Sequence, residues 1–116
     1  FTYDCEITRV VDGDTCDVNI DLGFKISHKA RVRLHGINAP ESRTRDKEEK
    51  YRGMQAKARF KELIREKDIR LISHDKGKYG RVLGEILIKN HNDKWDSVNK
   101  RLVKEGHAVE YYGGKR

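Results

Sequence analysis

The sequence predicts an α+β fold that is mainly β: a small five-stranded barrel with two to three α-helices packed against it. Three observations support this prediction. Short runs of alternating apolar and polar residues, typical of half-buried strands, recur along the chain. Two other stretches, one near the middle and one close to the end, have the helical period. At 116 residues, the chain is long enough for one domain with its own core.

The first three strands are expected in succession. Apolar residues alternate over residues 1–7 and again over 18–26, and between these runs lies the tight-turn signal Asp12-Gly13. Gly23 is expected to form a bulge or bend in the second strand. A third strand begins near residue 30, with apolar residues on one face and basic residues on the other. These strands are predicted to pair in antiparallel fashion.

The next segment is predicted to be a loop followed by a helix. Residues 42–52 carry charges of both signs and almost no apolar residue, so we expect a surface loop or the frayed start of a helix. From Gly53 onward the apolar residues fall on one helical stripe. They are Ala56, Phe60, Leu63 and Ile64.

Two strands and a second helix complete the predicted fold. The strands cover about residues 69–73 and 82–88. Asp96 or Ser97 can cap the following helix, and Gly106 is expected to end it. Three strands, a helix, two strands and a helix suit a five-stranded barrel of the oligonucleotide-binding type.

We expect a single domain over residues 1–116, with a loose tail at 113–116. The net charge of +7 favours a polyanionic partner, although simple solubility explains it equally well. No stretch is apolar and long enough to span a bilayer. The chain opens on Phe1 without a signal-peptide pattern, as expected of a mature or trimmed form.

The two cysteines are predicted to be free thiols. With a turn near Asp12-Gly13, Cys16 lies opposite about residue 10 and Cys5 opposite about residue 21. At ~3.3 Å per residue, the separation of roughly five to six residues along the ladder exceeds what a disulfide tolerates.

Two carboxylates mark the first turn. Asp12 and Asp14 have a spacing that allows them to share one face, and carboxylate oxygens are the ligands that calcium prefers. The alternative is an ordinary Asp-Gly turn, and this segment alone favours that alternative.

An arginine and a proline-containing corner follow. Arg33 lies on a strand whose other face is apolar, and arginine binds phosphate and stabilises developing charge strongly. An exposed arginine on a solvated face is the alternative. Pro40 restrains Ala39 to an extended conformation, which can fix the direction of its carbonyl. Glu41 can position or deprotonate a water molecule, or it can be an ordinary surface glutamate.

Five ordered segments together carry a specific signal. They are Val10 to Thr15; Arg33-Leu34 with Gly36 to Glu41; Gly53-Met54-Gln55-Ala56; Lys78-Tyr79-Gly80-Arg81; and Val98-Asn99 with Leu102-Val103, Gly106 and Ala108. In this order and at these spacings they resemble the staphylococcal-nuclease-like (thermonuclease) family over nearly the whole chain.

The resemblance implies three groups of site residues. The metal group comprises Asp14, Asn38 and the Ala39 carbonyl, supported by Asp12 and Thr15. The catalytic group comprises Arg33, Glu41 and Arg81. The substrate-binding group comprises Lys78, Tyr79 and Tyr112, of which the last would stack on a base.

The resemblance also implies an activity. The family's reaction is calcium-dependent hydrolysis of DNA and RNA phosphodiester bonds without sugar specificity, which leaves 3′-phosphate ends. It implies Ca²⁺ as cofactor, DNA or RNA as partner, a monomer without an obligate protein partner, no membrane association, and a secreted or periplasmic location.

One departure from the family pattern keeps alternatives open. Asn38 stands where the family usually has aspartate, so the corner lacks one negative charge and we expect weaker calcium binding or an altered metal preference. A catalytically weakened or inactive nucleic-acid-binding module, or a basic protein-interaction module, is therefore the alternative.

Overall fold

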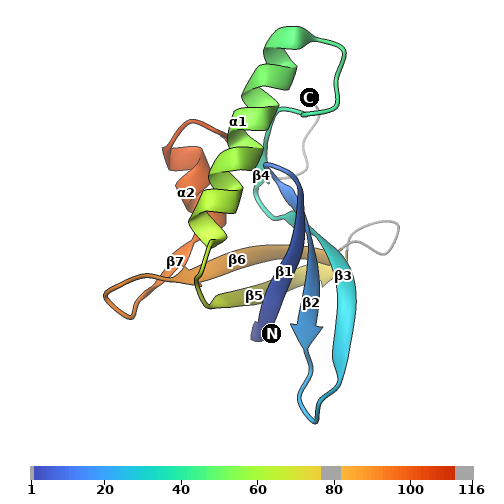
Figure 1. Ribbon diagram of the computed structural model, residues 1–116, viewed down its shortest axis with the longest axis vertical. Coiled ribbons are helices and arrows are strands. Elements are labelled where there is room, and N and C mark those ends of the chain that lie inside the picture. Colours follow the sequence, from blue (N-terminus) through green and yellow to red (C-terminus); the bar gives the residue numbers. More distant parts are fainter. Residues whose placement is uncertain (1, 77–81, 112–116) are drawn as a thin grey trace.

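The computed structural model describes residues 2–76 and 82–111 (Figure 1). In chain order the described elements are β1 (Thr2–Asp12), β2 (Thr15–Asp21), β3 (Ser27–Leu34), β4 (Ile37–Asn38), α1 (Lys47–Ile64), β5 (Ile69–Lys76), β6 (Val82–Lys89), β7 (Trp95–Ser97), α2 (Val98–Lys104) and β8 (Val109–Glu110).

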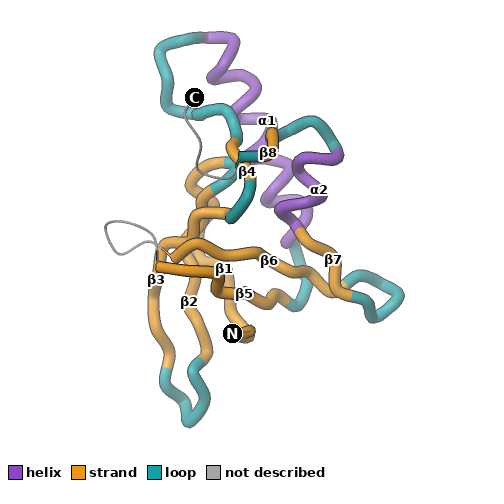
Figure 2. The backbone as a smooth tube through the Cα atoms, turned by 180° about the vertical axis from the view of Figure 1, so that it is seen from behind, coloured by secondary structure: helices purple, strands orange, loops and turns teal. Residues whose placement is uncertain are grey.

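Five of these strands close into the predicted barrel. The sheet order is β3-β2-β1-β5-β6, and a parallel pairing of β3 with β6 joins its two edges. The short strand β7 pairs with β6, and β4 pairs with β8 in a separate two-stranded sheet. Figure 2 shows the β4–β8 pair above the barrel strands and next to α1. The mainly β barrel with two helices is thus confirmed.

The core fills the barrel and the space beneath α1. Phe60 of α1 and Leu102 of α2 are fully buried, together with inward-facing strand residues such as Val32, Leu71 and Ile86. The two helices lie side by side above the barrel (Figure 1), and Arg59 of α1 forms an ion pair with Glu105 at the end of α2. Neither helix is long and apolar enough to cross a membrane, as far as the chain is described.

The second strand is shorter than predicted. Strand β2 ends at Asp21, and the apolar residues beyond it are exposed, with Phe24 98% accessible. Gly23, Phe24 and Lys25 all have positive φ angles, which a strand cannot accommodate. The alternating pattern therefore continues into a hairpin loop that the Ile26 N–H closes by donating to the Gly23 carbonyl.

Helix α1 begins at Lys47, well before Gly53, so the charged stretch is largely helical. Asp46 caps it, because its side chain accepts hydrogen bonds from the N–H groups of Glu48 and Glu49. The acidic first turn also complements the helix dipole. The capping residue Asp46 was a sequence signal for the true start of the helix, and the apolar pattern alone did not reveal it.

The cysteines are free, as predicted. Cys16 lies opposite Val10 and Cys5 opposite Ile20 in the β1–β2 ladder. Burial raises the pKa of the Cys5 thiol to about 11, with a smaller contribution from the charge of Asp4. Burial also raises the pKa of Cys16, which is wholly enclosed.

Candidate active site

The β1–β2 turn is pressed against α1 and the corner that follows β4. A Cβ on Gly13 would lie 2.6 Å from the Ala56 Cβ and 3.1 Å from the Ala39 Cβ, so only glycine fits there without movement. This close approach brings the neighbouring Asp14 to the end of β3 and to the backbone of Ala39.

The side chain of Asp14 joins three segments of the chain. One carboxylate oxygen, Oδ1, accepts a hydrogen bond from the Thr15 hydroxyl at 3.0 Å. The other, Oδ2, accepts from the Ala39 N–H at 2.9 Å and lies 3.1 Å from Nη1 of Arg33. The Leu34 N–H donates to the Asp14 carbonyl at 2.8 Å. Asp14 is therefore held in one orientation, with its side chain only 11% exposed.

Arg33 lies opposite Thr15 in the β2–β3 ladder, which places it beside the turn. Its Nη2 donates to the Asn38 side-chain oxygen at 3.3 Å, while Nη1 contacts Asp14. The side chain is 21% exposed, so part of the guanidinium remains accessible. Asp14 and Asn38 thus orient a cationic group that can receive an anion.

Arg31, two residues earlier on β3, has a different environment. Its side chain is 46% exposed and pairs with Asp17 on β2, with Nε 2.8 Å from Oδ1. Hydrogen bonds from Arg31 hold the pKa of Asp17 below its usual range. Arg31 is thus a surface ion-pair residue, while Arg33 belongs to the corner.

Asp12 does not join Asp14. Its Oδ1 accepts hydrogen bonds from the hydroxyl and, at 3.3 Å, from the N–H of Ser42. These contacts tie the end of β1 to the backbone directly after Glu41. Ser42 is buried, and nothing in the sequence pattern marked it as part of the site.

Glu41 has an environment different from that of Arg33 and Asp14. It is exposed and lines a cavity of about 540 Å³ with α1 and the segment after α2. No hydrogen bond or ion pair joins it to Arg33 or Asp14 within residues 2–76 and 82–111. Its backbone is fixed instead by the Asp12–Ser42 contacts and by close packing on Gly53.

Four predicted site residues lie outside the described residues. They are Lys78, Tyr79, Arg81 and Tyr112. The structure brings Asp14, Thr15, Arg33, Asn38 and Ala39 together and places Asp12 and Glu41 at the edge of this group.

Comparison with known families decides the assignment. The family model described as staphylococcal nuclease homologue matches residues 31–116. The chain belongs to this family.

Individual relatives match over most of the chain. It is 30% identical to the micrococcal nuclease of Shigella flexneri over 114 residues, which cover 93% of this chain and 59% of that protein. It is 29% identical to the protein ParB of Escherichia coli over 110 residues, covering 91% and 56%. An uncharacterized endonuclease of Haemophilus influenzae is 29% identical over 107 residues, covering 92% and 52%. The chain thus spans a little over half the length of these relatives.

In this staphylococcal nuclease homologue, the oxygen atoms around Asp14, Asn38 and Ala39 are of the chemical type that calcium prefers as ligands. The Asp14 carboxylate, the Asn38 amide oxygen and the Ala39 carbonyl are all hard donors. No group of three or more histidine, cysteine, aspartate or glutamate residues with metal-binding geometry occurs in the described part of the chain. The donor set therefore fits a hard cation, with Asp14 as its single carboxylate.

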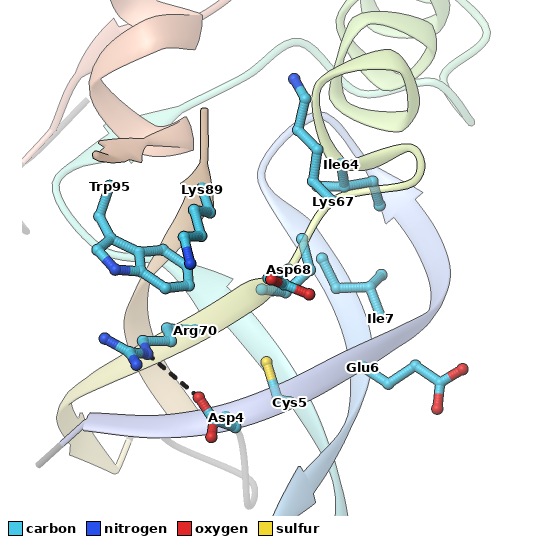
Figure 3. Close-up of a pocket in the computed structure, with 11 residues that line it drawn as sticks. Asp4, Cys5, Glu6, Ile7, Ile64, Lys67, Asp68, Arg70, Lys89 and Trp95 are labelled. Atoms are coloured by element: carbon cyan, nitrogen blue, oxygen red, sulfur yellow. Dashed lines mark hydrogen bonds and ion pairs between the residues drawn. The ribbon is translucent and has the colours of Figure 1, made fainter. Parts of the chain in front are cut away.

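A second pocket lies away from this corner, between β1, β5, β6 and the end of α1 (Figure 3). There the Arg70 guanidinium lies 4.3 Å from the centre of a Trp95 ring and forms an ion pair of 3.2 Å with Asp4. Lys67 and Asp68 also line the pocket, so its lining contains both acidic and basic groups. Because the Lys67 amine points away from the Arg70 guanidinium (Figure 3), these two cations do not meet at one point where they could hold a phosphate.

Proposed function

We propose that the chain is a calcium-dependent, sugar-nonspecific endonuclease that hydrolyses phosphodiester bonds of DNA and RNA and leaves 3′-phosphate ends. The observation that carries the proposal is the partly exposed Arg33 guanidinium, held between Asp14 and Asn38. Family membership and the nuclease and endonuclease names of the relatives support it.

The residues of the corner have distinct parts in such a reaction. Arg33 would bind a non-bridging phosphate oxygen and stabilise the extra negative charge that forms as water attacks the phosphorus atom. Because Asp14 and Asn38 already orient its guanidinium, little reorganisation is needed when that charge develops. Glu41 would orient the attacking water or accept its proton.

A 3′-phosphate product defines which bond breaks. Water adds to phosphorus, the bond from phosphorus to the 5′-oxygen breaks, and that oxygen leaves with a proton as a 5′-hydroxyl. Calcium, held by Asp14, Asn38 and the Ala39 carbonyl, would supply additional positive charge at the phosphate. Arg81 would provide a second guanidinium, and Lys78, Tyr79 and Tyr112 would contact the substrate as in the family.

Cleavage of labelled single-stranded DNA and RNA oligonucleotides, in calcium and in chelator, tests the proposal. We expect both substrates to be cut only with calcium, and their ends to be accepted by a phosphatase specific for 3′-phosphates. Nucleic-acid binding without cleavage at any calcium concentration would instead support the binding module. Asn38 and the single carboxylate favour that second candidate.

A further inference from the structure

Two histidine rings, one from the turn after β3 and one from β5, stack close to the candidate active site. The ring centroids of His35 and His74 are 4.4 Å apart and the ring planes differ by 17°. His35 lies in the turn directly after β3 and is two residues beyond Arg33, so the chain itself brings the pair close to that arginine. The His35 N–H donates to the Gly84 carbonyl at 2.7 Å, which fixes its backbone against β6.

A β-bulge places His74 opposite its partner. In the β5–β6 ladder Ser73 pairs with Gly84 and Asp75 pairs with Leu83, so His74 is the extra residue. Bulges commonly re-aim a side chain next to an active site. The stacked pair is therefore produced by a local irregularity in β5 together with the end of β3.

The stacked pair borders a cavity of about 580 Å³ whose lining includes residues of β4, β6, α2 and β8. This volume lies within the roughly 300–1,000 Å³ typical of ligand pockets. Ile37 and Val103 give the cavity an apolar part. Buried Asn99 of α2 holds the wall rigid, because its Nδ2 donates to the carbonyls of His35 and Gly84 at 2.9 and 3.1 Å.

The charges around this cavity balance. Lys100 and Lys104 contribute two positive charges, and Glu85 and Glu110 contribute two negative ones. A phosphate would therefore gain little net attraction. A flat, neutral group with hydrogen-bonding edges suits the aromatic wall, the apolar part and the mixed polar rim.

We propose that the His35–His74 pair and this cavity form a nucleobase subsite for the strand whose phosphate lies at Arg33. The proposal rests on the proposed nuclease function and specifies how the substrate is held. Base stacking on an aromatic ring needs no particular base, so the subsite would add affinity for unpaired strands without sequence specificity.

Binding measured in chelator separates the subsite from catalysis. The probes are a short single-stranded oligothymidylate and a sugar–phosphate strand of the same length that carries no bases. The variants are His74→Ala, His74→Phe and, as control, His91→Ala in the exposed turn after β6. Fluorescence anisotropy gives each Kd, and the histidine ring proton signals in NMR spectra report stacking directly.

We expect His74→Ala to raise the Kd for the base-bearing strand about fivefold or more, with the Kd for the abasic strand unchanged. His74→Phe should retain the preference for bases, and His91→Ala should match the wild type. In the wild type, the base-bearing strand should shift the His74 ring signal, while the abasic strand should leave it in place.

If the wild type cleaves DNA, two results would overturn the nucleobase subsite while leaving the proposed nuclease function intact. One is an equal loss of affinity for both strands in His74→Ala, which would indicate a structural role. The other is no loss for either strand. Failure of the wild type to bind or cleave either nucleic acid would overturn the proposed function as well.

Discussion

Replacing Gly53 by alanine tests whether α1 positions the corner that carries Glu41. An alanine normally stabilises a helix interior by about 1 kcal/mol relative to glycine. Here, however, a Cβ would overlap the carbonyl group of Glu41 and lie 2.7 Å from the Ser42 backbone nitrogen. Because these are backbone atoms on a segment tied to Asp12, a side-chain rotation cannot relieve the overlap.

The cost of overpacking exceeds the gain in helix stability, so we expect Gly53→Ala to destabilise the fold and also to slow cleavage. Overpacking typically costs about 1–3 kcal/mol, so after the helix gain we expect Gly53→Ala to lower the free energy of unfolding by about 1 kcal/mol. Displacing Glu41 by about 1 Å is expected to slow DNA cleavage on the order of 100-fold. Urea unfolding and single-turnover cleavage measure the two effects.

Met54→Ala is the matched control, because Met54 is adjacent in α1 and its side chain is largely exposed. It should cleave DNA at the wild-type rate. A Gly53→Ala variant that is more stable than the wild type and cleaves equally fast would refute the claim that α1 fixes the position of Glu41.

Three further predictions concern charge and protonation. Asn38→Asp adds a carboxylate to the corner, so half-maximal cleavage should require less calcium; an unchanged calcium titration would contradict the role given to this charge. Hydrogen bonds from Arg59 and Arg101 lower the pKa of Glu105 to about 2, so its stabilising effect is present above the unfolded-state pKa and lost as the pH falls toward 2. Glu105→Gln should therefore lower the free energy of unfolding at pH 7 by about 1 kcal/mol, and the difference should vanish near pH 2; a constant difference would be inconsistent. Cys5, with its pKa raised to about 11, should react with a thiol reagent at pH 8 far more slowly in the native protein than in urea, and equal rates would contradict its burial.

The barrel could be predicted because its signals are local. Alternating apolar residues identify half-buried strands, and the Asp12-Gly13 turn fixed the β1–β2 register closely enough to place Cys16 opposite Val10. The same alternation wrongly predicted that the strand continues after Asp21, because the backbone there forms a hairpin loop with positive φ angles. Periodicity also missed the start of α1, since the first turns of that helix are charged on all sides.

The geometry of the candidate site was predictable only in part. The motifs identified Asp14 and Arg33, and the structure brings them into contact. Ser42 was missed because its importance comes from a contact with Asp12, which lies thirty positions earlier at the end of β1. The stack of His35 and His74 depends on a bulge and on the closure of the barrel, and neither leaves a pattern in the sequence.

The most direct test of the central claim compares two arginines on one strand. In single-turnover cleavage with saturating calcium, we expect Arg33→Ala to be slower than the wild type by roughly 100- to 1,000-fold, as for loss of one transition-state donor. Arg31→Ala removes the same charge from the surface pair with Asp17, and it should retain most of the activity. Equal losses in both variants, or full activity in Arg33→Ala, would contradict the assignment of Arg33 to the scissile phosphate.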